Sequence, residues 1–184
     1  MEQINKVDKY AEYGNRGIEI YSNWLKQVAQ KKDEEHTFEL FSAVDKFSVY
    51  DLLQIKRNND DYSVDDVQYI ELKLREVRIT DYDDCSIDNE KILKLQRLSQ
   101  ISGHKVFIVA IYEKDRKIAV WELDSENEIE TRETVAKWHT AEDWGRKTKI
   151  MAMFRLRDAH IYSYRYCIHY IFHILHINMA RERG

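Results

Sequence analysis

The feature that most constrains the fold is the segment Val106–Tyr112, which is an almost unbroken run of apolar residues. A strand that is apolar on both sides has to be covered on both of its faces. Such strands are typical of the centre of a sheet that has helices or a second layer on either side. The segment therefore predicts a layered protein built around a central strand.

The residues just before this strand predict an amphipathic helix over 89–102. Asp88 is suited to cap its first turn and Gly103 to end it, because glycine readily adopts the left-handed conformation that closes many helices. Apolar residues recur at helical spacing and predict one buried stripe. The stripe consists of Ile92, Leu95, Leu98 and Ile101.

The other elements follow from the same periodicities. Residues 18–30 are expected to form a first helix, 81–84 an acidic loop, and 133–142 another helix. Strands are expected over 37–43, 47–55, 67–79, 106–112, 118–123 and 149–155. Helices alternating with strands predict an α/β fold with a central mixed β-sheet flanked by helices. With 184 residues, 43% of them hydrophobic, the chain is expected to form a single domain over 1–184.

Composition excludes several classes of protein. A net charge of −4 argues against a large basic footprint for nucleic acid, although a local basic groove stays possible. Cys85 and Cys167 stand in no paired pattern, which favours reduced thiols. The longest apolar stretch, 166–177, is too short to span a bilayer, and 1–9 has no apolar run typical of a secretory signal. We therefore expect a soluble, cytoplasmic protein without nucleotide-binding glycine loops.

A group of charged residues lies on two strands that are expected to pair. Antiparallel pairing of 47–55 with 67–79 would bring Asp51 close to Glu71. Glu71 and Lys73 are two residues apart on one strand, so their side chains leave the same face. Two carboxylates are hard oxygen ligands that suit Mg²⁺, and a neighbouring ammonium could orient a metal-bound water.

Asp51 followed further on by Ile70-Glu71-Leu72-Lys73 resembles the active-site signature of the PD-(D/E)xK nuclease superfamily. Tyr50 stands where that signature has proline. The order of helix, three strands, helix and hydrophobic strand over residues 14–124 is similar as well. The resemblance implies a restriction-endonuclease-like core (αβββαβ), with 125–184 as a C-terminal extension of the same domain.

The resemblance also implies a function and further site residues. Members bind a divalent metal through the two acidic residues and hydrolyse phosphodiester bonds, here expected to be a magnesium-dependent nuclease acting on DNA. Mn²⁺ is a possible substitute, RNA stays open as a substrate, and a homodimer is implied. Several members carry an additional Glu on the first helix, matched by Glu19, and some a Gln on the second, matched by Gln96.

Basic residues concentrate in the last third of the chain and alternate with aromatic ones. This pattern suits a surface that follows a nucleic-acid backbone, although a solvated cationic face explains it equally well. The candidate nucleic-acid contacts are Gln96, Arg75, Arg146, Lys147 and Lys149.

Other interpretations of the charged residues stay open. Asp51, Glu71, Lys73 and Arg75 could line a solvated sheet face with only a weak ion pair. The alternative function is then a noncatalytic binding or assembly protein that keeps a nuclease-like fold. His169, His173 and His176 share one face of a possible helix, but packing or dimerisation is favoured there over zinc binding. The acidic residues of 81–88 lack the spacing of a calcium loop.

Overall fold

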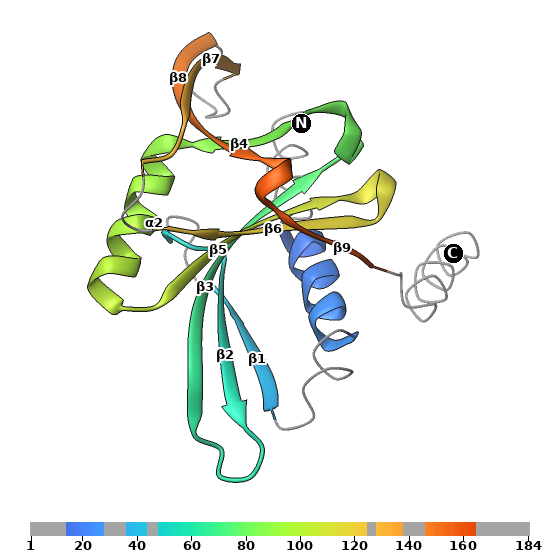
Figure 1. The fold of residues 1–184 in the computed structure, drawn as a ribbon, viewed down its shortest axis with the longest axis vertical. Coiled ribbons are helices and arrows are strands. Elements are labelled where there is room, and N and C mark those ends of the chain that lie inside the picture. Colours follow the sequence, from blue (N-terminus) through green and yellow to red (C-terminus); the bar gives the residue numbers. More distant parts are fainter. Residues whose placement is uncertain (1–13, 28–35, 44–47, 125–127, 138–145, 165–184) are drawn as a thin grey trace, which may run out of the picture.

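The computed structural model describes residues 14–27, 36–43, 48–124, 128–137 and 146–164. A six-stranded sheet with the order β1-β2-β3-β5-β6-β9 forms the centre, and a three-stranded sheet with the order β4-β8-β7 packs beside it (Figure 1). The larger sheet contains β1 (His36–Ser42), β2 (Leu52–Asn58), β3 (Val64–Arg75), β5 (Lys105–Tyr112), β6 (Lys117–Leu123) and β9 (His160–Ser163). The smaller sheet contains β4 (Asp84–Asp88), β7 (Thr131–Lys137) and β8 (Arg146–Arg155).

The larger sheet is mixed, as predicted. Strands β1, β2 and β3 form an antiparallel meander, and β3 pairs in parallel with β5. The connection between those two parallel strands contains β4 and the helix α2 (Asn89–Ser102). The predicted order of helix, three strands, helix and strand is thus confirmed, with β4 as an added strand beyond the predicted acidic loop.

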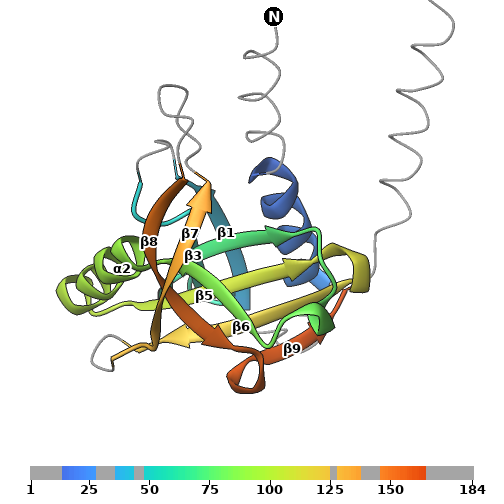
Figure 2. The same cartoon turned by 90° about the horizontal axis from the view of Figure 1, so that it is seen from above.

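Strand β5 is covered on both faces, which confirms the expectation from its sequence. On one face, Val106, Ile108 and Ala110 pack with residues of α2 and the smaller sheet. On the other face, Val109 and Ile111 pack with the helix over 14–27. Figure 2 shows the two helices on different sides of the larger sheet.

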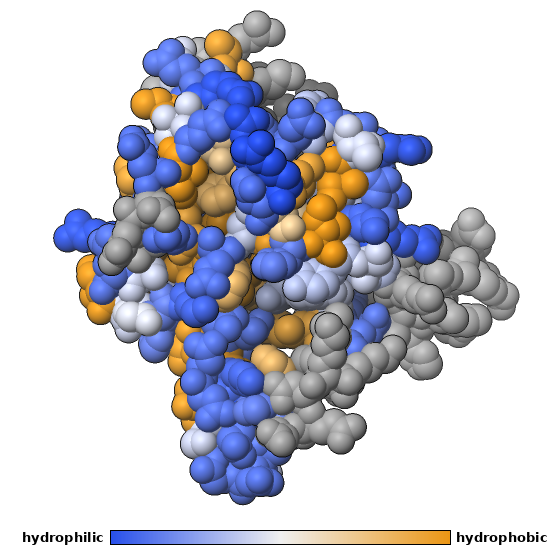
Figure 3. Space-filling view, viewed as in Figure 1, coloured by the Kyte–Doolittle hydropathy of each residue, from blue (hydrophilic) through white to orange (hydrophobic). Residues whose placement is uncertain are grey.

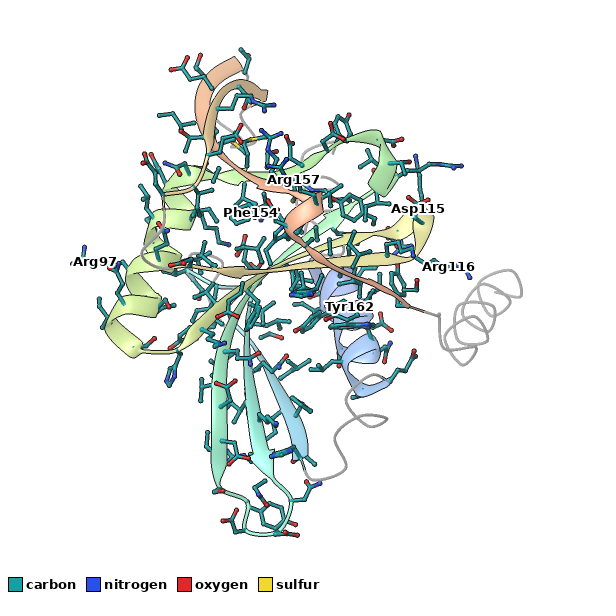
Figure 4. All side chains as sticks on the ribbon, viewed as in Figure 1. Arg97, Asp115, Arg116, Phe154, Arg157 and Tyr162 are labelled. Atoms are coloured by element: carbon teal, nitrogen blue, oxygen red, sulfur yellow. The ribbon has the colours of Figure 1, made fainter. Side chains whose placement is uncertain are left out.

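The helix over 14–27 contributes aromatic residues to the second of these faces. Tyr21 and Trp24 are buried there, and the ring centroid of Trp24 lies 5.1 Å from that of Tyr162 in β9 (Figure 4). The Tyr21 hydroxyl donates a hydrogen bond of 3.0 Å to Gln54 on β2. This face of the sheet therefore holds an apolar and aromatic core.

Helix α2 has the predicted caps but a shorter buried stripe. The Asp88 side chain accepts a hydrogen bond from the Glu90 backbone N–H, and Gly103 closes the helix with a φ of 71°. Ile92 and Leu95 are buried, whereas Ile101 is 75% exposed. The prediction for Ile101 was wrong because the apolar pattern continues into the last turn, where the sheet no longer covers the helix.

The helix expected over 133–142 is not formed where the structure describes it. Residues 131–137 form β7, which pairs antiparallel with β8. Thr131 and Val135 are β-branched, and the hydrogen bonds offered by a neighbouring strand outweigh a weak helical pattern. Positions 138–142 lie outside the described residues.

Strands β2 and β3 are joined by a turn that projects from the rest of the sheet (Figure 1). Tyr62 in this turn has a φ of 58°, and its backbone N–H donates to the Asn58 carbonyl. Hydrophilic side chains cover this end of the molecule in Figure 3. Neither of the described helices is long and apolar enough to cross a membrane.

Candidate active site

Asp51 lies at the point where β2 begins, directly opposite Glu71 on β3. The pairing of Leu52 with Ile70 sets this position, and the Asp51 backbone N–H donates to the Ile70 carbonyl at 2.9 Å. The Leu72 backbone N–H in turn donates to Asp51 Oδ2 at 2.7 Å. The Asp51 carboxylate is therefore held by the backbone of the neighbouring strand, and the predicted approach to Glu71 is confirmed.

Glu71 and Lys73 lie on the face of β3 that α2 covers. Their partners in the parallel pairing are Ile108 and Ala110, which belong to the core on that side. The Glu71 side chain is 0% exposed, and Lys73 Nζ lies 2.6 Å from its Oε1 atom. A solvated sheet face is therefore excluded for Glu71.

A second lysine, which the sequence interpretation missed, completes the cluster. Lys91 in the first turn of α2 places its Nζ atom 2.5 Å from Glu71 Oε2 and 3.4 Å from Asp51 Oδ1. Two carboxylates and two ammonium groups thus meet below the first turn of α2. We call Asp51, Glu71, Lys73 and Lys91 the charged cluster.

The sequence does hold a signal for Lys91. A cation in the first turn of a helix is unfavourable because the helix dipole is positive there. Lys91 also stands one helical turn before the buried Leu95, on the side that packs against the sheet. A lysine in such a position needs a specific acidic partner, and Glu71 and Asp51 supply it.

Burial and charge act in opposite directions within the cluster. Burial, supported by the nearby Asp51 charge, raises the pKa of Glu71 above its usual range, and the two lysines only partly offset this. Burial alone would lower the pKa of Lys91, but the combined attraction of Glu71 and Asp51 outweighs it and raises that pKa. Lys91 therefore stays an ammonium at neutral pH.

The arrangement suits a cation. One oxygen of Asp51 and one of Glu71 both contact the same ammonium, so the two carboxylates already converge on a single positive group. Aspartate and glutamate oxygens are ligands of Mg²⁺, which usually keeps several waters and binds substrate phosphates as well. Among the described residues no group of three acidic, histidine or cysteine side chains could hold a metal. A bound Mg²⁺ would depend on the Asp51–Glu71 pair, with water and substrate completing its coordination.

Glu19 is not on the same side of the sheet as the charged cluster. It belongs to the helix over 14–27, whose neighbours Ile20 and Tyr21 pack on the face opposite to Glu71 and Lys73. The structure does not bring Glu19 and Glu71 together on one face. The role implied for Glu19 by its place in the sequence has no geometric support.

The predicted nucleic-acid contacts that are described each make an internal contact in this structure. Gln96 donates to the Asp124 carbonyl at 2.9 Å, so it fastens α2 to the end of β6. Arg75 donates to the Ser86 carbonyl at 2.7 Å, which joins β3 to β4. Lys149 Nζ lies 2.7 Å from Asp88, the cap of α2. These three side chains support the elements that carry the charged cluster.

Other predicted residues are placed only in part. Arg146 and Lys147 lie in β8, but their side chains lie outside the described part of the chain. His169, His173 and His176 lie outside it entirely, as does Cys167. Cys85 is a buried free thiol.

Two tyrosines lie next to the charged cluster. The ring centroid of Tyr50, the residue before Asp51, lies 4.9 Å from that of Tyr69 on β3. Tyr69 is two residues before Glu71 and so shares its face, and its ring centroid lies 6.0 Å from His104. Tyr50 thus packs beside the site at the position where the nuclease signature has proline.

Comparisons with known proteins give little that is specific. No protein-family model matches the sequence, and no curated protein matches it. Among solved structures, the chain is similar to Hjc, a Holliday junction resolvase from the archaeal hyperthermophile Archaeoglobus fulgidus. The TM-score is 0.36 at 10% identity, with 71% of this chain and 87% of that chain covered. A similarity of this extent carries no argument about activity, so the function has to be inferred from the charged cluster itself.

Proposed function

We propose that the protein is a metal-dependent nuclease that hydrolyses phosphodiester bonds in DNA with Mg²⁺. The observation that carries the proposal is the convergence of Asp51 and Glu71 on one cation, with Lys73 beside Glu71 on the same strand. Placing a fully buried carboxylate next to a second one is costly for the fold. A role in metal-assisted hydrolysis would explain why the protein keeps this unfavourable arrangement.

Each residue has a distinct role in this proposal. Asp51 and Glu71 would hold the metal, which when bound supplies a polarised phosphoryl oxygen and a water of lowered pKa. Lys73 would position the attacking water and stabilise negative charge as it develops on the phosphate. The Leu72 N–H fixes the orientation of Asp51, so the pair is preorganised by backbone contacts.

One observation favours a second candidate function. The two lysines already balance the two carboxylates, so the cluster is electrically satisfied without a metal. This balance favours a noncatalytic nucleic-acid-binding or protein-assembly role in which the ion pairs are purely structural. The two candidates differ in whether a divalent cation acts at Asp51 and Glu71.

Cleavage of labelled single- and double-stranded DNA with Mg²⁺ or Mn²⁺ tests the proposal. We expect metal-dependent cutting that falls about 10²-fold or more in Asp51→Asn and in Lys73→Ala. Lys105→Ala is the matched control, because this exposed lysine pairs with Glu122 elsewhere on the larger sheet. The control should cut like the wild type.

RNA and branched DNA substrates extend the same experiment. If none of these substrates is cut with either metal, and the metal leaves the melting temperature unchanged, the nuclease proposal is wrong and the noncatalytic one is favoured. If cutting survives both substitutions, the activity resides elsewhere or in a contaminant.

A further inference from the structure

Lys91 occupies the place in the charged cluster where a shared cation would bind. Its Nζ atom contacts Glu71 Oε2 at 2.5 Å and Asp51 Oδ1 at 3.4 Å, whereas Lys73 contacts only the other oxygen of Glu71. Lys91 is thus the ammonium that bridges the two carboxylates. It reaches them from α2, while both acidic residues belong to the β2–β3 pair.

The charges explain why some cation has to be present there. Glu71 is fully buried, and Asp51 lies directly opposite it on the neighbouring strand, so two carboxylates lie close together in a partly dry site. Apart from the two ammonium groups, no hydrogen-bond donor in the described part of the chain reaches the Glu71 oxygens. Without Lys91, Glu71 Oε2 would have no positive partner among the described residues. Lys91 is therefore the counter-ion of the pair.

The same place cannot hold Lys91 and a divalent cation together. Lys91 already contacts one oxygen of Glu71 and one of Asp51, so a divalent cation held between these carboxylates would lie close to the ammonium, and the two positive groups would repel each other strongly in a partly dry site. The Lys91 side chain is 28% exposed, so its long flexible stem has a route from the site to solvent.

We propose that Lys91 is a built-in competitor of the divalent cation, which has to displace the Lys91 ammonium before Asp51 and Glu71 can bind it. The proposal rests on the proposed function, because it assumes that this pair takes up a metal. It adds a regulatory property: metal affinity is set partly by a residue that is neither a metal ligand nor one of the residues expected from the nuclease signature. Lys91 keeps the metal-free protein folded at the cost of weaker metal binding.

Calorimetric titration with Mn²⁺ and with Mg²⁺, in the absence of nucleic acid, tests the proposal. Lys91→Gln should bind the metal about tenfold more tightly than the wild type, the equivalent of losing one modest ion pair. Lys94→Gln is the matched control, because it removes the same charge from an exposed position on the same helix. The metal affinity of Lys94→Gln should stay within about twofold of that of the wild type, since the exposed Lys94 charge is largely screened by solvent and salt.

Thermal unfolding supplies a second readout that does not depend on activity. Metal-free Lys91→Gln should melt below the wild type, because the two carboxylates then repel each other, and saturating metal should raise its melting temperature by more than it raises that of the wild type. Lys91→Met provides the same test with an unbranched apolar stem, should the Gln variant fold poorly. If the ion pair is purely structural, metal-free Lys91→Gln should still melt below the wild type, but saturating metal should raise the melting temperatures of the two proteins by the same amount.

The outcomes separate the two proposals. If the wild type binds metal and Lys91→Gln and Lys91→Met bind it equally or more weakly, the competition is overturned while the nuclease proposal stands. If Asp51→Asn binds metal as the wild type does, the ion lies elsewhere and the competition is again overturned. If no variant binds Mn²⁺ or Mg²⁺ at millimolar concentration without nucleic acid, the competition is overturned, and if DNA and RNA also stay uncut with either metal, the proposed function fails as well.

Discussion

The two faces of the larger sheet are built from neighbouring residues of the same strands but differ in the chemistry of their side chains. On the face under the helix over 14–27, Leu52 and Ile70 are fully buried in an apolar core. On the face under α2, the adjacent residues Asp51 and Glu71 belong to the charged cluster. A one-residue step along β2 and β3 thus separates two buried apolar side chains from two carboxylates, of which only Glu71 is fully buried.

The difference shows that stability alone does not explain the charged cluster. Burial of apolar side chains stabilises the fold directly, whereas a buried ion pair often contributes no more than an apolar pair of the same size. The protein nevertheless keeps four charged side chains between α2 and the sheet. Both faces hold a hydrophobic core that maintains the fold, and we infer that the charged cluster is retained within the second face for binding or catalysis.

Removing an apolar side chain from the first face should have the largest effect on stability. Ile70→Ala is expected to lower the free energy of unfolding by about 2–5 kcal/mol, because Ile70 is fully buried and the cavity cannot close completely. Urea denaturation followed by circular dichroism measures the change. A loss below about 1 kcal/mol would contradict the assignment of Ile70 to a closely packed core.

A double-mutant cycle on the second face should give an intermediate effect. We expect a coupling of about 1–3 kcal/mol between Glu71→Gln and Lys91→Gln, because the carboxylate is buried and contacts the ammonium directly. The same cycle on the exposed pair Lys105–Glu122 is the control, with an expected coupling of about 0–1 kcal/mol. Equal couplings in the two cycles would mean that the buried cluster behaves like a surface ion pair.

The cap of α2 should give the smallest effect, and that effect should depend on pH. Partial burial opposes ionisation of Asp88, but hydrogen bonds from Lys149 and from the Glu90 N–H outweigh it and hold the pKa of Asp88 below its usual range. A lowered pKa stabilises the fold above the ordinary pKa of the group, and this contribution is lost as the pH falls through the lowered value. Asp88→Ala should therefore cost about 1 kcal/mol at pH 7.

Urea denaturation at pH 7 and at pH 3 measures this dependence. The difference between Asp88→Ala and the wild type should shrink at the lower pH, where protonation starts to remove the contribution from the wild type too. Glu76→Ala, which removes an exposed carboxylate outside any helix, should show little difference at either pH. A constant difference at both values would mean that the cap acts without its charge.

The elements that follow from local pattern were predicted well. Strand β5 is apolar throughout, and the caps of α2 are set by Asp88 and Gly103, so neighbouring residues in the sequence determine them. The pairing of β2 with β3 also followed, because only a short polar turn separates the two strands. These features depend on contacts between residues close in the sequence.

The features that depend on distant contacts were missed or incorrectly predicted. Lys91 joins the charged cluster only because α2 packs over β3, and it lies 40 residues from Asp51 in the chain. The helix expected over 133–142 gave way to β7 because β8 offered a pairing partner. Glu19 has the right place in the sequence, but its helix packs on the other face of the sheet. Sequence order alone does not specify which face a helix covers.

The hydrogen bond from the Leu72 amide to Asp51 has a consequence for spectroscopy. The amide proton reports on the carboxylate directly, since its chemical shift depends on the charge and orientation of the acceptor. In a ¹⁵N-labelled sample, the Leu72 resonance should therefore respond to any ion that changes the bonding of Asp51. The rate at which the Leu72 amide proton exchanges with deuterium would show how often its hydrogen bond to the Asp51 carboxylate breaks. The Leu72 amide thus reports on the site without any chemically attached label.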